Sequence, residues 1–295
     1  MPFLFTCPHC GLHTHVAEAY AGQSGPCARC GRMVTVLPLA DERPAPRAGG
    51  GTSVGVVVII VAAAALGMVL ACGGVLALLF SQVGSSREAA RRSQCSGHLK
   101  QIALAMHNYH DTYQCFPPAV ITDASGRPMQ SWRVAILPFL EQAPLYQRYN
   151  SNEPWDSPAN RALGSLMPPV YRCPSDASAA STETNYVMIV GKDTVGGLPN
   201  EAVSLKDITD GTANTILVVE VVGSGIHWME PRDLSIDELS RAINDGSGQW
   251  ISSRHPGGAN AACADGSLHF LSQSIDQATL RALILRNDGT AIPLL

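Results

Sequence analysis

The sequence predicts an α+β fold in which a long N-terminal helix packs on an antiparallel sheet, preceded by a transmembrane helix and a small zinc ribbon. Three observations support it: an apolar run without charged residues, an apolar stripe with helical spacing, and short β-branched segments between Pro and Gly. With 46% hydrophobic and 15% charged residues, the chain has too much apolar surface to stay disordered. Its formal net charge of -4 creates no field that attracts nucleic acid, so we expect no nucleic-acid partner.

The first predicted domain, residues 1–37, carries two Cys-x-x-Cys motifs, at Cys7 and Cys10 and at Cys27 and Cys30. Two such turns can direct four thiolates to one point and close a tetrahedral zinc site. So short a segment has no core without metal. Because four cysteines complete the coordination shell, we expect this zinc to be structural; another metal, or a disulfide or redox pair, is the alternative. The segment resembles the small zinc ribbons at the N-terminus of many bacterial membrane proteins.

A Pro- and Gly-rich linker over 38–53 leads to an apolar run over 54–80. At 1.5 Å per residue the run makes about 40 Å of helix, more than the roughly 30 Å hydrocarbon core of a bilayer. It is therefore predicted to be a single transmembrane helix in the cytoplasmic membrane, with the lipid bilayer as its partner. Flanking basic residues do not decide the orientation, but metal-held thiolates favour a reducing compartment. We expect the N-terminus in the cytoplasm and the domain over 81–295 outside.

Beyond the apolar run, the chain is predicted to form the long helix of the fold. Its apolar side chains recur in alternate steps of four and three residues, which makes one continuous stripe. They are Cys95, Leu99, Ile102, Met106, Tyr109 and Tyr113. Gly84, Ser85 and Ser86 form a candidate hinge before this helix, and Phe116-Pro117 ends it. The stripe is expected to lie on a sheet made by the following residues.

Shorter elements follow, separated by Pro and Gly. Short helices are predicted over 131–140 and 144–150, strands over 185–190 and 215–222, and a closing helix over 276–285.

The clearest local signal is a hairpin over 259–271 around Asp265 and Gly266, predicted as a two-residue type I′ turn. In that register Cys263 lies opposite Leu268. One apolar face then contains Ala261, Cys263, Leu268 and Phe270, and the other face contains Ala262 and His269.

Five motifs occur in a characteristic order: REAARRSQCSGHLKQIALAMHNYHDTYQCFPP, SWRVAILPFLEQAPLY, YRCPSD, DGTANTILVVEVV and HPGGANAACADGSLHFLS. Over about residues 87–275 the chain thereby resembles the bacterial family catalogued as domain of unknown function 1559, which is associated with prepilin-type proteins. The family's C-terminal His-x(9)-Asp-Gly signature is matched by His255, Asp265 and Gly266. The resemblance implies a pilin-like outer domain, a long helix on an antiparallel sheet, and no known reaction. A solute-binding role is suggested for the family by name only.

The N-terminus departs from that family. Many relatives resemble type IV prepilins, with a short basic leader, a Gly cleavage site and a Glu at the fifth mature position, whereas residues 49–56 here read GGGTSVGV and 54–80 contain no Glu. In pilins that Glu neutralises a neighbour's amino terminus inside an apolar core. Without it, we expect an uncleaved anchor and no conventional pilus assembly.

Two histidine groups could carry chemistry. His107, His110 and Asp111 could hold a metal, or could border the seam between helix and sheet through hydrogen bonds. His255 and Asp265 could be a catalytic pair, but no nucleophile motif accompanies them. Turn formation by Asp265 and a tight loop at His255 explain these two residues better.

Two further groups have similar alternatives. The stretch over 210–214 could form a calcium loop or a tight turn. The four tryptophans, Trp132, Trp155, Trp228 and Trp250, could form a carbohydrate surface, but loop tryptophans more often anchor irregular segments to a core.

Four cysteines lie beyond the apolar run. Cys95 and Cys115 would be separated by about 27 Å of helix, and a disulfide needs α-carbons within about 7 Å. Cys263 lies on the predicted apolar hairpin face and is expected to be a buried free thiol. The pairing of Cys95 with Cys173 is favoured, because Cys95 lies on the stripe that packs against the sheet.

Together these features favour a non-enzymatic single-pass membrane protein. Its pseudopilin-like outer domain would act as a cell-envelope scaffold or interaction module, with envelope proteins, including pilus or secretion components, as partners. The alternatives are a transmembrane sensor that signals through the zinc ribbon, and an envelope solute- or glycan-binding protein.

Overall fold

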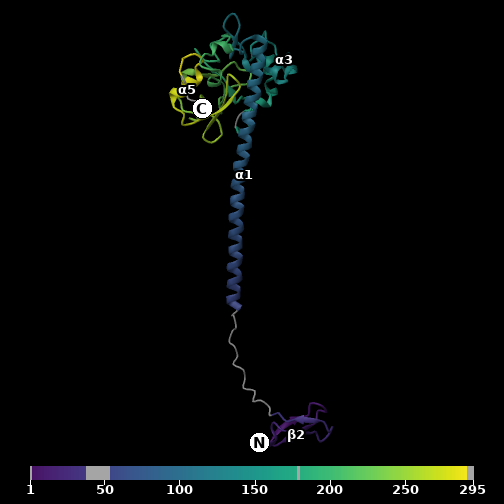
Figure 1. Cartoon of the computed structure of the whole chain (residues 1–295). Coiled ribbons are helices and arrows are strands. Elements are labelled where there is room, and N and C mark those ends of the chain that lie inside the picture. The colour runs from purple at the N-terminus through teal and green to yellow at the C-terminus, as the bar shows by residue number, and fades with distance from the viewer. Residues whose placement is uncertain (1, 38–53, 178–179, 291–295) are drawn as a thin grey trace. The chain divides into compact units, whose positions relative to one another are not determined.

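The structure is a computed structural model that describes residues 2–37, 54–177 and 180–290 (Figure 1). The predicted linker over 38–53 lies outside these residues. The chain divides into two compact units, Met1–Gly73 and Gly74–Leu295. The finer division into four domains stays a prediction.

The N-terminal unit contains two small hairpins. β1 (Phe3–Thr6) pairs antiparallel with β2 (His13–Val16), and β3 (Ser24–Pro26) pairs antiparallel with β4 (Met33–Thr35); the 3-10 turn η1 (Glu18–Tyr20) lies between them. The small apolar core consists of Cys7, Cys27 and Val34, with Phe5, Cys10 and Leu12 packed against it. So small a buried apolar core stabilises the two hairpins only weakly.

Helix α1 (Val54–Tyr113) is the longest element. It continues without a break through Gly84, Ser85 and Ser86, so the predicted hinge is wrong. Within the described residues, no helix combines the length and the apolar character needed to cross a bilayer, so the predicted transmembrane helix over 54–80 is wrong. In the sequence the apolar run stands out as a separate element. In the structure it is the first part of a longer helix, because the backbone hydrogen bonds of a helix continue equally well through the polar residues that follow.

The C-terminal part of α1 supplies the predicted apolar stripe. Cys95, Leu99, Ile102 and Met106 are fully buried, and the helix ends at Tyr113. Gln114, with φ of 62°, adopts the left-handed conformation that closes many helices. The predicted stripe is therefore confirmed from Cys95 to Met106, whereas Tyr113 at its end is 58% exposed.

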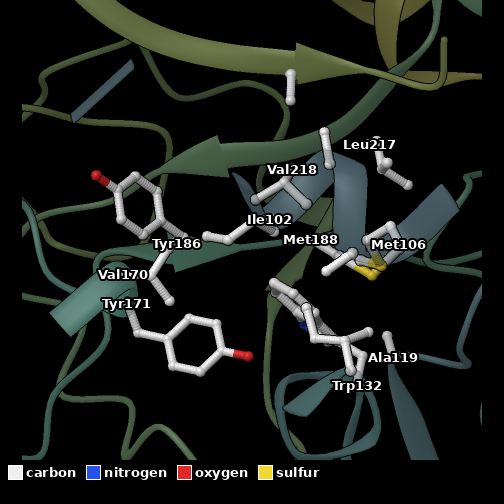
Figure 2. Packing of buried hydrophobic residues seen from close by; sticks show 14 of the residues in the cluster. Ile102, Met106, Ala119, Trp132, Val170, Tyr171, Tyr186, Met188, Leu217 and Val218 are labelled. Carbon is white, nitrogen blue, oxygen red and sulfur yellow. The ribbon is translucent and has the colours of Figure 1, made fainter. Parts of the chain in front are cut away.

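The central sheet has the strand order β12-β11-β9-β7, with every pair antiparallel. Its strands are β7 (Tyr186–Val187), β9 (Ile216–Glu220), β11 (Gly258–Cys263) and β12 (Leu268–Ser272). All five residues of β9 are buried, because apolar clusters cover both faces of the sheet. The first cluster contains the α1 stripe, and Figure 2 shows Ile102 and Met106 beside Leu217 and Val218. The second contains residues of α5 (Gln277–Ile284).

The β11–β12 hairpin has a different register from the predicted one. Ala262, not Cys263, lies opposite Leu268. The Gly266 amide donates to the Cys263 carbonyl at 2.9 Å, and Gly266 has φ of 82°. The connection is thus a turn followed by a left-handed glycine, a three-residue loop in place of the two-residue type I′ turn. One added loop residue shifts the pairing by one residue and exchanges the faces of β12 relative to β11.

The remaining elements surround this core. Two small sheets are β5 (Val120–Thr122) with β6 (Pro128–Ser131), antiparallel, and β8 (Ile189–Val190) with β10 (Leu234–Ser235), parallel. Short helices are α2 (Trp132–Ala135), α3 (Ala143–Arg148) and α4 (Pro158–Arg161). The 3-10 turns are η2 (Leu137–Leu140), η3 (Gly164–Leu166), η4 (Pro169–Tyr171), η5 (Leu205–Asp207), η6 (Thr212–Asn214) and η7 (Ile236–Glu238). The described fold is thus a mixture of helices and small sheets rather than a membrane helix followed by one sheet.

Candidate functional site

The two Cys-x-x-Cys loops have the same backbone structure. In the first, the Cys7 amide donates to the Leu12 carbonyl and the Gly11 amide donates to the Cys7 carbonyl, both at 2.9 Å. In the second, the Cys27 amide donates to the Arg32 carbonyl and the Gly31 amide donates to the Cys27 carbonyl, both at 2.8 Å. Gly11 and Gly31 have φ of 69° and 68°, a conformation that a residue with a Cβ adopts at a cost. The glycine after each motif therefore closes each loop.

These loops bring the four predicted cysteines together. The Sγ atoms of Cys7 and Cys30 are 4.0 Å apart, and those of Cys10 and Cys27 are 3.8 Å apart. All four sulfurs lie within 4.8 Å of one another. Zn–S bonds of about 2.3 Å in a tetrahedron separate the sulfurs by about 3.8 Å. The cluster is therefore close enough to hold a metal ion.

Local dipoles already favour thiolate at one position in this cluster. Backbone amides of Cys30 and Arg29 lower the pKa of Cys27 to about 6. For Cys10 the Leu12 amide acts in the same direction, but burial and the three neighbouring thiols raise its pKa to about 11. A cation that took up the cluster would displace the protons that these sulfurs otherwise share.

A second cluster surrounds His255, the first residue of the His-x(9)-Asp-Gly motif expected from the sequence. Its side chain is fully buried, and its Nδ1 lies 2.7 Å from Glu88 Oε1 of α1. Its Nε2 lies 3.5 Å from Glu220 Oε1 at the end of β9 and 3.6 Å from Cys173 Sγ. Burial lowers the pKa of His255, but hydrogen bonding and charge from the two carboxylates outweigh it and raise the pKa above its ordinary value.

Both carboxylates have further partners. Glu88 accepts from Arg91 at 2.6 Å and from Ser175 at 3.2 Å. Burial raises the pKa of Glu88, but His255, Arg91 and Ser175 together lower it below its ordinary value. Glu220 Oε2 accepts from the amide and the side chain of Asn260, at 2.8 and 2.9 Å. The Glu88–His255–Glu220 array is thus an ion-pair network in which both carboxylates are oriented by further hydrogen bonds.

A disulfide joins Cys95 of α1 to Cys173, with Cα atoms 5.2 Å apart, and this is the pair favoured from the sequence. Both residues are buried against the histidine cluster. Cys263 is a buried free thiol, as expected.

Asp265 and Gly266, the other residues of this motif, lie in a different environment. Asp265 accepts from the amide of Ser267 at 2.8 Å, and the Gly266 carbonyl accepts from Lys100 at 2.8 Å. His255 has Glu88 as its close carboxylate partner in place of Asp265. His255 and Asp265 therefore do not form the catalytic pair that the sequence could suggest.

The remaining candidate groups have structural contacts. His110 Nε2 accepts from the Leu205 amide at 3.3 Å, and His107 packs edge-on against Phe116. Among the described residues neither belongs to a group of three or more ligands that could hold a metal. Asp210, in the predicted calcium loop, accepts from the amide of Gly289 at 3.0 Å.

The tryptophans mostly anchor loops to the core. Trp132, Trp228 and Trp250 are fully buried, and Trp155 is partly buried against the same core. The alternative of a carbohydrate surface therefore has no exposed aromatic platform in these three residues.

Glu88 and Glu220 are the site residues that sequence reasoning missed. Glu220 ends the strand sequence ILVVE, in which a carboxylate after four apolar residues signals a buried charge that requires a partner. Glu88 lies seven residues before Cys95, two helical turns along the same face of α1.

Comparison with known proteins supports the resemblance found in the sequence. The model of the family described as protein of unknown function (DUF1559) matches residues 84–198 and 222–278. No curated protein and no solved structure matches the chain. The two matched segments include α1 from residue 84, both cysteines of the disulfide, and His255, Asp265 and Gly266. They cover more than half of the chain, which therefore belongs to the DUF1559 family.

Proposed function

We propose that this chain is a non-enzymatic protein of the cell envelope, in which a structural zinc ribbon accompanies an α+β domain that acts as a scaffold or interaction module. The observation that carries the zinc assignment is the set of four sulfurs within 4.8 Å on two equivalent loops. Because thiols of the chain occupy all four positions, a bound zinc ion has no open position for a substrate. This supports a structural role for Cys7, Cys10, Cys27 and Cys30.

The disulfide supports an envelope location for the α+β domain. Disulfides persist in oxidising compartments and are rare where cellular thiols stay reduced. Cys95–Cys173 is buried in the main core.

The surface that best supports an interaction role is a groove between α1 and β12. Its volume is about 400 Å³, and its lining includes Arg92, Ser96, Asn260 and Phe270. β12 is an edge strand of the central sheet, and such an edge can pair with an extended segment of another protein. The Arg92 guanidinium lies 3.5 Å from the centroid of the Phe270 ring, which places a cation at the groove. We propose an extended, acidic segment of an envelope protein, such as a pilus or secretion component, as the partner.

The zinc assignment is tested by metal analysis of the purified full-length chain. We expect one zinc per chain, lost in Cys27→Ser and retained in the matched control Cys115→Ser. A chain that folds its N-terminal unit without metal, or binds none at the four cysteines, would contradict it.

The interaction role is tested by photo-crosslinking in intact cells. A crosslinking amino acid at Phe270 should capture an envelope protein, and Arg92→Glu should abolish the capture. The same crosslinker at Leu198, which is 51% exposed and outside the groove lining, is the control. Equal capture at both positions, or none at Phe270, would count against the proposal.

A further inference from the structure

We infer that opening the Cys95–Cys173 disulfide creates a second metal site, in which the two cysteines, His255 and Glu220 bind a zinc-type cation. Each of the four residues offers a ligand atom, and these atoms lie within 4.8 Å of one another. All four side chains are buried in the main domain. This inference goes beyond the proposed function and does not depend on the ribbon cysteines.

Glu220 provides the first independent indication of a ligand. It is 1% exposed, and its Oε1 has no hydrogen-bond partner among the described residues. Its other oxygen is held by two hydrogen bonds from Asn260, so the carboxylate cannot turn freely. That oxygen lies 3.5 Å from His255 Nε2, an ion-pair contact without a hydrogen bond. A buried carboxylate oxygen that is oriented but lacks a hydrogen bond is costly unless a cation or donor reaches it.

His255 is oriented as a metal ligand. Metal-binding histidines commonly donate their other ring N–H to a carboxylate, which fixes the tautomer and the ring. Here Nδ1 lies 2.7 Å from Glu88 Oε1, and Arg91 and Ser175 hold that carboxylate. Nε2 then faces Cys173 Sγ at 3.6 Å. The outer contacts of a metal site are therefore already present around the disulfide.

The missing requirement is two thiolates. A disulfide sulfur is a poor ligand, whereas two thiolates, an imidazole and a carboxylate suit zinc. A dithiol donor would supply two electrons and two protons, breaking the Cys95–Cys173 bond and becoming a disulfide itself. Zinc would then replace the two cysteine protons, together with any proton on His255 Nε2, and those protons would pass to solvent. The sulfurs need to separate only to about 3.8 Å, the edge of a zinc tetrahedron.

Such a site would preserve the link between α1 and the segment that carries Cys173. The disulfide joins them in an oxidising environment, and the metal would join the same two sulfurs in a reducing one. The domain would then keep a cross-link during reducing conditions, including synthesis before the disulfide forms.

The experiment measures zinc in the full-length chain in two redox states. One sample is produced and kept under reducing, oxygen-free conditions so that the buried disulfide never forms; the other is oxidised. Both are equilibrated with Zn²⁺, freed of excess metal and analysed for zinc per chain. We expect one more zinc per chain in the reduced sample than in the oxidised one. The same difference of one is expected in Cys27→Ser/Cys30→Ser, which removes the ribbon site and separates this result from the proposed function.

Two variants assign the ligands. Glu220→Gln and His255→Gln should each weaken binding of the additional zinc at least tenfold in chelator competition. Cys263→Ser, which removes a buried thiol outside the cluster, should bind it like the parent. Equal zinc content in the two redox states, or unchanged affinity in both ligand variants, would overturn the inference. If the reduced chain is unfolded without metal, zinc must restore its native tryptophan fluorescence, and failure to do so also overturns it.

Discussion

The disulfide should provide a large part of the stability of the α+β domain. Cys95 and Cys173 are separated by 78 positions in the sequence. Loop-closure entropy for a loop of that length corresponds to about 4.5 kcal/mol at 25 °C. Because whole domains are stable by only about 5–15 kcal/mol, its loss should bring the domain close to unfolding.

The assay is urea unfolding of the oxidised and the reduced full-length chain, followed by tryptophan fluorescence. All four tryptophans lie between residues 132 and 250, so the signal reports on this domain and not on the ribbon. A chelator is present in both samples, because a metal at the reduced cysteines would replace the cross-link. We expect the free energy of unfolding to fall by about 3–5 kcal/mol on reduction.

Comparing two redox states of the same chain avoids the cavity that a Cys→Ala pair would leave. Cys263→Ser should show the same difference between its redox states as the parent. A difference below about 1 kcal/mol would refute the reasoning, because it would mean that the loop is already restrained in the unfolded chain.

Three further predictions concern the core, the hairpin and the histidine cluster. Asp233→Ala should lower the free energy of unfolding by about 3–5 kcal/mol in urea titration, because it leaves the buried Arg133 guanidinium, 2.5 Å from that carboxylate, without its counter-charge. Gly258→Ala should destabilise the domain more than Gly257→Ala in the same urea titration. A Cβ at Gly258 would lie 2.0 Å from the Leu271 carbonyl oxygen, whereas a Cβ at Gly257 meets no atom and costs only the strain of a φ of 89°. Equal effects would argue against the β11–β12 register. The carboxylates of Glu220 and Glu88 raise the pKa of His255, so the contribution of His255 to stability should be complete below pH 6.5 and fall as the pH rises through its pKa in the folded state. His255→Gln should remove that decline from the plot of unfolding free energy against pH. An unchanged plot would show that the ion pairs contribute nothing.

Local patterns predicted the elements that depend on neighbours in sequence. The alternate steps of four and three residues predicted the buried stripe from Cys95 to Met106, because side chains at this spacing share one face of any helix. The two Cys-x-x-Cys motifs predicted four converging sulfurs, because each tight loop turns its own pair inward. Asp276 begins the closing helix by accepting from the Thr279 amide, as a capping residue does.

Among the predictions from the sequence, the register of the hairpin and the transmembrane helix were wrong. The register of the hairpin depends on whether Gly266 ends a two- or a three-residue loop, and both use the Asp-Gly pair. The apolar run over 54–80 predicted a transmembrane helix from hydrophobicity alone, and the described residues of the structure do not support it.

By itself the sequence determined the family, the position of the four-cysteine cluster and the buried face of the long helix, since each depends on residue types at short, regular spacing. Only the tertiary structure decided that His255 lies between Glu88 and Glu220 beside the Cys95–Cys173 disulfide. These residues come from α1, the end of β9 and separate loops, and their separation in sequence carries no information about distance in space. Their meeting depends on how the helix stripe packs on the sheet, which is a property of the whole core.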